Sequence, residues 1–84
     1  MEIRVGTVTH YFNRLGVAVV QMTGELKVGD RICIVGRTSD FEQPVGSMEI
    51  NHNPVQRVWT GMEVALKVVE PVRNGDDVFK IVEE

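Results

Sequence analysis

The sequence is short and has few cysteine, proline and aromatic residues. Its 84 residues include one cysteine, three prolines, one tryptophan, one tyrosine and three phenylalanines. A chain this short has no room for a Rossmann domain, a kinase or an enzyme with two lobes. We therefore expect one domain over residues 1–84.

Each shortage excludes a class of protein. Cys33 is the single cysteine, so no internal disulfide forms, and a reducing cytoplasm fits best. No apolar run approaches the ~20 residues of a membrane span, and the first residues lack the apolar core of a signal peptide. The chain has nine basic against 12 acidic residues, which disfavours nonspecific duplex binding but leaves a local basic patch open. We expect a cytoplasmic protein with no membrane contact.

Short apolar and β-branched runs alternate with glycine and Asn/Asp turns. This pattern predicts strands over residues 3–12, 17–22, 31–35, 41–52, 64–69 and 78–82. Residues 26–30 form a short bridging segment, and residues 55–59 fit either a helical turn or an extended connector. Gly16 is expected at positive φ, and Pro44 implies an edge position or a bulge.

Six such strands favour an all-β fold, either a β-barrel or a sandwich, and of these we expect a small, closed, six-stranded antiparallel β-barrel. Closure would remove the exposed edges that an open sheet leaves for aggregation. Strict alternation in residues 3–12 would place Val5 and Val8 on opposite faces of the first strand.

The sequence contains no motif of paired carboxylates, zinc-protease histidines, a nucleophile elbow or a phosphate loop. We therefore expect no enzyme, no catalytic residues and no cofactor. His10 and His52 fall near strand ends, but a metal needs a third ligand, so no metal site is expected. Cys33 is interpreted either as a packed apolar residue or as a surface thiol.

The aromatic residues allow two interpretations. Tyr11, Phe12 and Trp59 would form a stacking platform for single-stranded bases, with Arg14 and Arg57 on the phosphates. Alternatively, Phe12 lies in the core, Tyr11 is half-buried and Trp59 caps one end of the barrel.

Several segments together carry a family resemblance. The segment LKVGDRICIVG resembles the core of the second domain of elongation factor Tu-like translational GTPases. Further segments match that domain in the same order, and the likeness extends over residues 2–82. These segments are residues 16–20, 45–50, 60–66 and 72–78.

The resemblance implies a barrel of translation-factor type. In that family the barrel accompanies a GTP-binding domain, and in elongation factors it helps hold the aminoacyl end of transfer RNA. It implies here a non-catalytic module associated with RNA or the ribosome, with transfer RNA as a candidate partner and no GTP binding by this chain alone. Among the family's RNA-end contacts only Glu49 matches by motif, and it joins Tyr11, Arg14, Arg57 and Trp59 as a candidate nucleic-acid-binding residue.

A departure from the family's motif supports a second prediction of function. The chain departs from the family's Gly-Glu-Asn at residues 61–63, which read GME, so the aminoacyl pocket is not reproduced. Similar barrels are appended to some collagenase-like peptidases, where they resemble docking modules. The alternative function is therefore a protein-docking β-barrel without nucleic-acid contact, which the acidic balance favours. A shared exposed face for the aromatics and arginines would favour RNA, and their dispersal would favour docking.

Overall fold

The fold consists entirely of strands and turns in the residues described, 1–83, of a computed structural model. The prediction of an all-β chain is thus confirmed, and these residues include no helix that could cross a membrane. The ten strands are β1 Glu2–Phe12, β2 Val17–Met22, β3 Leu26–Lys27, β4 Arg31–Val35, β5 Asp40–Pro44, β6 Met48–Ile50, β7 Asn53–Val55, β8 Arg57–Val58, β9 Glu63–Lys67 and β10 Asp77–Ile81.

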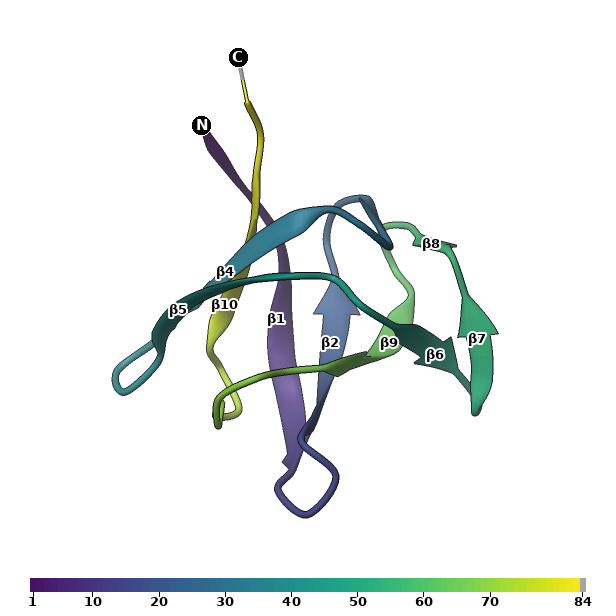
Figure 1. The fold of residues 1–84 in the computed structure, drawn as a ribbon, viewed down its shortest axis with the longest axis horizontal. Coiled ribbons are helices and arrows are strands. Elements are labelled where there is room, and N and C mark those ends of the chain that lie inside the picture. Colours follow the sequence, from purple (N-terminus) through teal and green to yellow (C-terminus); the bar gives the residue numbers. More distant parts are fainter. Residues whose placement is uncertain (84) are drawn as a thin grey trace.

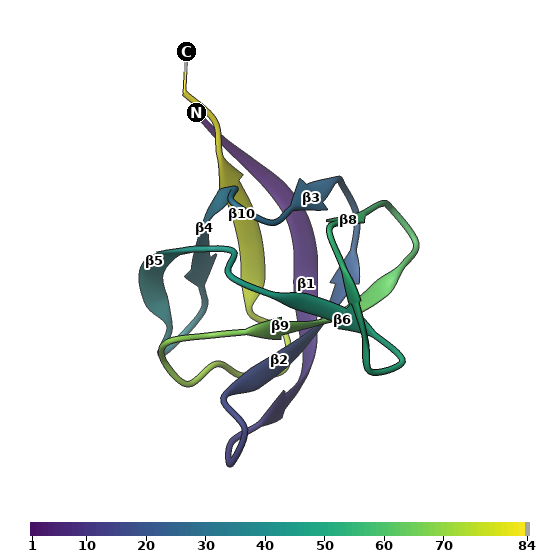
Figure 2. The same ribbon diagram turned by 45° about the vertical axis from the view of Figure 1, so that its right-hand side comes forward.

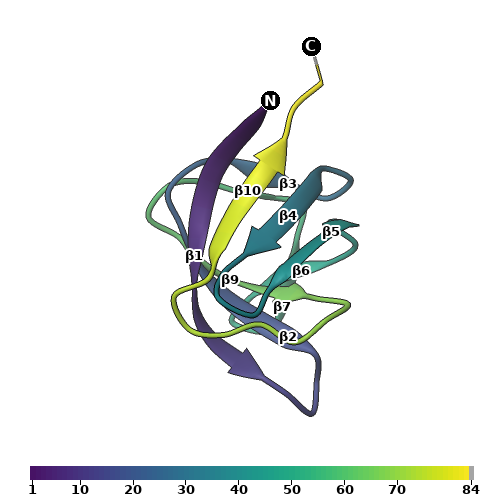
Figure 3. The same cartoon turned by 90° about the vertical axis from the view of Figure 1, so that its left-hand side faces the viewer.

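Eight strands form one antiparallel sheet in the order β5-β4-β10-β1-β2-β9-β6-β7, and β3 pairs with β8 in a separate two-stranded sheet. The large sheet curls around a core of aliphatic side chains, and the two termini lie side by side (Figure 1). Figure 3 shows β1, β10, β4 and β5 as neighbouring strands of one wall. The largest fully buried side chains include Met22, Leu26, Ile32, Met48 and Leu66.

The prediction of a closed six-stranded barrel is wrong. The strands β5 and β7 are the two edges of the large sheet and do not pair with each other. Both edge strands contain a proline, Pro44 and Pro54, which lacks the donor that edge-to-edge pairing needs. Of the two possibilities for Pro44, an edge position or a bulge, the structure shows the edge position.

The predicted strand over residues 41–52 is also wrong, because it is interrupted between β5 and β6. At the interruption the backbone of Val45 leaves the ladder and bonds the turn that precedes β4. The Val45 N–H donates to the Asp30 carbonyl at 2.8 Å, and the Gly29 N–H donates to the Val45 carbonyl at 2.9 Å. Residues 55–59, for which two conformations were open, are extended and include β8.

Two bulges in β1 overturn the expected alternation. The register shifts between Arg4 and Gly6 against β10, and between Val8 and His10 against β2. An extra residue at each shift changes which side chains face inward, so Val5 and Val8 are both buried. Beyond the second bulge Phe12 points outward and is 46% exposed, so its placement in the core is wrong as well.

Two turns have the backbone conformation that their residues favour. Gly16 lies at φ +64° in the turn between β1 and β2, as expected from the sequence. Asn51 and His52 connect β6 to β7 at φ 51° and 65°, and this two-residue turn has the positive φ values of type I′.

The side chain of Gln43 on β5 connects the edge of the sheet to the segment that leaves β9. Its Nε2 donates to the Lys67 carbonyl at 2.8 Å, and its Oε1 accepts from the Val69 N–H at 2.8 Å. The side-chain amide thus donates one hydrogen bond and accepts one, as a backbone peptide group does in a sheet. Because Gln43 is only 4% exposed, these bonds replace those that water would otherwise make with the amide. We call this pair of hydrogen bonds the Gln43 bridge.

A second buried polar cluster joins the β4–β5 loop to the turn before β10. Asp76 is buried, and its carboxylate accepts from the Ser39 hydroxyl and, at 2.9 Å, from the Arg73 N–H. Gly36 lies so close that a Cβ there would be 1.9 Å from Asp76 Oδ1. Any larger residue at position 36 would clash with the Asp76 carboxylate, so only glycine fits here without a rearrangement.

Removal of the Gln43 bridge tests its contribution to stability. We expect Gln43→Ala to lower the free energy of unfolding by about 2 kcal/mol, because the Val69 N–H and the Lys67 carbonyl lose their partner. Urea unfolding followed by circular dichroism measures this change. The exposed Gln56→Ala is the matched control and should change stability by less than about 0.5 kcal/mol.

The close approach at Gly36 predicts a difference between two glycines. Gly36→Ala should destabilise the fold by about 2 kcal/mol, because the methyl group displaces the Asp76 carboxylate from its donors. Gly46→Ala is the control, since a Cβ there meets nothing within 4 Å. Thermal unfolding of the two variants measures the difference, and equal midpoints would contradict the steric argument.

Candidate functional site

The five residues proposed for nucleic-acid binding do not form one surface. Arg14 lies exposed in the β1–β2 turn, and Tyr11 is half-buried against the core, as the second interpretation predicted. Arg57 and Trp59 lie in and just after β8, whereas Glu49 lies on β6. The β1–β2 turn projects from the lower end of the molecule and β8 lies near the upper end (Figures 1 and 2). The platform is therefore divided between opposite ends.

A groove with a volume of about 210 Å³ brings Arg57 and Trp59 together with residues from two other strands. Since β3 and β8 are antiparallel, Lys27 lies directly opposite Arg57 and both are exposed, while Leu26 and Val58 are buried. Lys80 of β10 completes the cationic lining. We call this the basic groove; its lining residues are Glu25, Leu26, Lys27, Asp30, Arg57, Val58, Trp59 and Lys80.

Asp30 neutralises one cation of the basic groove. Its Oδ1 lies 2.7 Å from Lys27 Nζ, and its Oδ2 accepts from the Lys27 N–H at 3.0 Å. Partial burial acts to raise the pKa of Asp30, but the hydrogen bonds from Lys27 and the charges of Lys27 and Lys80 lower that pKa below its ordinary value of 3.8. Asp30 is thus ionised near neutral pH.

A second concave surface lies on the outside of the sheet. Side chains of β2 and β9 that point away from the core line a groove of about 300 Å³ together with the β1–β2 turn. Its lining residues are Leu15, Val17, Ser47, Glu49, Ala65 and Lys67. Beside the groove, Val19 is the cross-strand partner of Ala65 and Phe12 lies opposite Val17. Leu15 in the turn is 61% exposed. We call Phe12, Leu15, Val17, Val19 and Ala65 the outer strip.

Two charged residues border the outer strip. Glu49 of β6 lies opposite Ala65, and Lys67 of β9 lies opposite Val17. The Lys67 amine donates to the Leu15 carbonyl at 2.7 Å and so holds the turn against the end of β9. The strip therefore has an apolar centre with one charge of each sign at its border.

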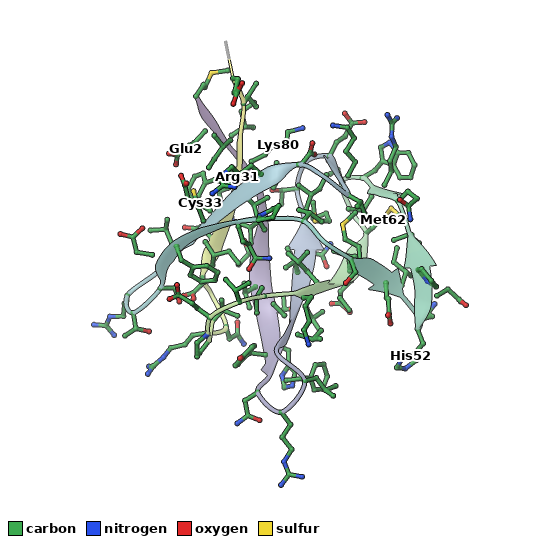
Figure 4. All side chains as sticks on the ribbon, viewed as in Figure 1. Glu2, Arg31, Cys33, His52, Met62 and Lys80 are labelled. Atoms are coloured by element: carbon green, nitrogen blue, oxygen red, sulfur yellow. The ribbon has the colours of Figure 1, made fainter. Side chains whose placement is uncertain are left out.

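The buried reactive groups are already engaged by the fold. Cys33 is buried and its Sγ lies 3.4 Å from Glu2 Oε1, and Figure 4 shows the two side chains together with Arg31 near the termini. Burial, the hydrogen bond to Glu2 and nearby carboxylates raise the pKa of this thiol to about 11. Cys33 is thus a packed, protonated side chain, as one of the two interpretations predicted.

The two histidines are not brought together. His52 lies in the β6–β7 turn, at the lower right in Figure 4, whereas His10 lies near the end of β1 with its ring 4.4 Å from that of Phe12. Among residues 1–83, no three His, Cys, Asp or Glu side chains are grouped as metal ligands.

Sequence reasoning identified Arg57 and Trp59 but missed Lys27 and Lys80. Lys80 enters the basic groove only because β10 pairs with β4 and β1, which no local pattern reveals. Trp59 is 49% exposed and lines the groove, so its assignment as a cap is wrong. The outer strip was also missed, although the continuous apolar run in residues 17–22 signals a strand with apolar side chains on both faces.

Comparison with known proteins identifies relatives of a different kind from those expected. No family model matches the chain. A protein named as an uncharacterized protease from Methanocaldococcus jannaschii is 36% identical over 83 residues, and a collagenase from Porphyromonas gingivalis is 35% identical over 81 residues. The matches cover 98% and 94% of this chain but only 20% of each relative.

The similar solved structures also come from a protein described as a peptidase. Two crystal structures of the C-terminal domain of a protein described as a U32 peptidase from Geobacillus thermoleovorans have TM-scores of 0.85 and 0.87 and 22% sequence identity. They cover 89% and 93% of this chain, and the matched regions are 95% and 91% of those chains. At this identity the likeness concerns the fold.

The resemblance to elongation factor Tu-like GTPases is therefore wrong, and so is the RNA-binding assignment drawn from it. The matching proteins are a protease, a collagenase and U32 peptidase domains. The segments that suggested a translation factor consist mainly of turn glycines and aliphatic residues, which small β-domains of different families share.

The ion pair in the basic groove predicts a pH-dependent contribution to stability. Because folding lowers the pKa of Asp30, its contribution is full above the unfolded value near 3.8 and is lost as the pH falls through the folded value. At pH 7 we expect Asp30→Asn to lower the free energy of unfolding by about 1 kcal/mol, since Lys27 is half-exposed and its attraction is screened.

Urea unfolding at several pH values measures this difference, which should shrink below about pH 4. Asp40→Asn is the matched control, since Asp40 is exposed and makes no ion pair among the described residues. A destabilisation by Asp30→Asn that stays constant down to pH 2 would show that charge is not its source.

Proposed function

We propose that this chain is a non-catalytic docking domain that binds another polypeptide in a peptidase assembly. One observation carries the proposal: almost the whole chain aligns with one fifth of two relatives named as a protease and a collagenase. A domain of the same fold is also the C-terminal domain of a U32 peptidase. A unit of this size thus accompanies a much larger chain in each relative.

The partner we propose is the body of a peptidase of this kind. The match leaves 80% of each relative outside the aligned part (100% less the 20% covered). A domain carried on such a chain has that remaining part as its nearest binding surface. We therefore favour docking onto the peptidase body over a role in nucleic-acid recognition, because a net charge of −3 is unfavourable for binding phosphates.

The outer strip is the surface that fits this partner best. Exposed apolar side chains in one patch are typical of protein–protein contacts. Phe12 and Leu15 supply large side chains at one end, and Val19 with Ala65 supplies the flat centre. Glu49 and Lys67 at the border would orient the partner through complementary charges.

The state of the buried reactive groups supports a role in binding rather than in catalysis. The Cys33 thiol, with a pKa of about 11, is protonated near neutral pH, whereas a nucleophile needs the thiolate. The Ser39 hydroxyl is buried and donates to Asp76, in a cluster that joins two loops. These groups stabilise the fold, and the chemistry of an assembly would reside on the partner.

Binding to a truncated relative tests the docking role. The M. jannaschii protein without its 83 matching residues is titrated with this chain in a calorimeter. We expect a one-to-one complex, because the added chain would occupy the surface from which its counterpart was removed. Val19→Lys and Leu15→Lys should each weaken binding about tenfold or more, since each places a charge in the apolar contact.

Val35→Lys is the matched control for these variants. Val35 lies on β4, is exposed, and has Asp77 and Asp40 as its cross-strand partners, so a lysine there is well tolerated. Circular dichroism verifies that all three variants are folded. An unchanged affinity for both outer-strip variants, or no complex with the unmodified chain, would contradict the proposal.

A further inference from the structure

The basic groove has a charge opposite to that of the chain as a whole. Three cations line it, Lys27, Arg57 and Lys80, against two carboxylates, Glu25 and Asp30, whereas the whole chain has a net charge of −3. Cations gathered on an otherwise acidic protein form a local positive patch that attracts anionic ligands.

Two of these cations oppose each other across a pair of strands. Lys27 and Arg57 are cross-strand partners of the β3–β8 sheet, and like charges in this position destabilise a sheet. Asp30 relieves only one of them, since its carboxylate binds Lys27. In the described part of the chain, Arg57 and Lys80 have no carboxylate within ion-pair distance. An anion bound to Arg57 and Lys80 would neutralise these two charges and so reduce the repulsion between Arg57 and Lys27.

Trp59 adds an apolar wall beside the two cations. Its backbone N–H donates to Met62 Sδ at 3.2 Å, which fixes the chain where it leaves β8, while its side chain is about half exposed. Trp59 and Lys80 both line the groove. Tryptophan and arginine are both enriched among the residues that contribute most to binding at the centres of protein interfaces.

The chemistry of the lining selects a carboxylate. A guanidinium binds a carboxylate with two parallel hydrogen bonds, and Arg57 has no competing intramolecular partner among the described residues. Inorganic phosphate has no apolar group to pack on Trp59, whereas a peptide carboxylate can have an apolar side chain beside it. The volume of about 210 Å³ also leaves room for an apolar side chain next to the carboxylate.

We infer that the basic groove binds an acidic peptide segment, in which a carboxylate lies between Arg57 and Lys80 and a neighbouring apolar side chain packs on Trp59. This inference rests on the proposed docking function and specifies the chemistry of the partner. The outer strip provides the apolar contact, and the basic groove recognises a second, acidic segment near β8.

A fluorescence titration tests the inference, because Trp59 is the single tryptophan of the chain and lies in the groove. The probe is a blocked hexapeptide of alternating glutamate and phenylalanine at about 50 mM salt. We expect a saturable change in the Trp59 emission. Replacement of the glutamates by glutamine should weaken binding at least about tenfold, since the charge-assisted hydrogen bonds are lost. Inorganic phosphate should not displace the peptide at equal concentration.

Two substitutions distinguish the groove from general charge attraction. Arg57→Gln should weaken peptide binding about tenfold, because Arg57 is the proposed bidentate donor. Arg37→Gln removes the same charge from the exposed loop between β4 and β5, outside the groove, and should change the affinity less than about twofold. Lys80→Gln provides a second groove variant if the first is poorly folded.

The results separate this inference from the proposed function. Equal weakening by Arg57→Gln and Arg37→Gln, equal binding of the glutamine peptide, displacement by phosphate or no emission change would each overturn the acidic-segment inference. Docking to the truncated peptidase relative depends on the outer strip, so its success would leave the proposed function standing in all of these cases.

Discussion

The hydrogen bonds of the Gln43 side chain impose the constraint on which the arrangement of the other elements depends. An eight-stranded sheet must curl around one small core although its edges, β5 and β7, do not pair. Gln43 joins the β5 edge to the end of β9 instead, because its amide bonds the Lys67 carbonyl and the Val69 N–H. Because this connection uses one side chain, the backbone is free to leave β5 at Val45 and bond the turn before β4. A smaller apolar residue at this position would leave the Lys67 carbonyl and the Val69 N–H without this partner.

Local features of the fold were predictable from the sequence, and features that depend on distant partners were not. The bounds of β2 and β4 follow from runs of β-branched residues between turns, and Gly16 has the expected positive φ. The interruption after β5 was not predictable, because the bonds that stabilise it come from Gly29 and Asp30. Closure was inferred from the general cost of exposed edges, whereas this chain protects its edges with prolines and one side chain.

The same distinction applies to the candidate site. Arg57 and Trp59 were identified because a cation beside an aromatic residue is conspicuous in a sequence. Tyr11 packs against the core and Arg14 lies in the β1–β2 turn, so neither joins the groove. Lys80 reaches the basic groove only through the pairing of β10. The outer strip depends on the bulge in β1, which turns Phe12 outward. A peptidase-associated docking domain agrees with both surfaces, one apolar and one cationic.

Methyl chemical shifts measured by nuclear magnetic resonance test the docking account most directly. Spectra of this chain would be recorded with and without the truncated M. jannaschii relative. The account predicts shifts at the methyl groups of Leu15, Val17, Val19 and Ala65, while those of the exposed Val35 and the buried Ile34 stay unchanged. Shifts centred on Val35 with none in the outer strip would contradict it.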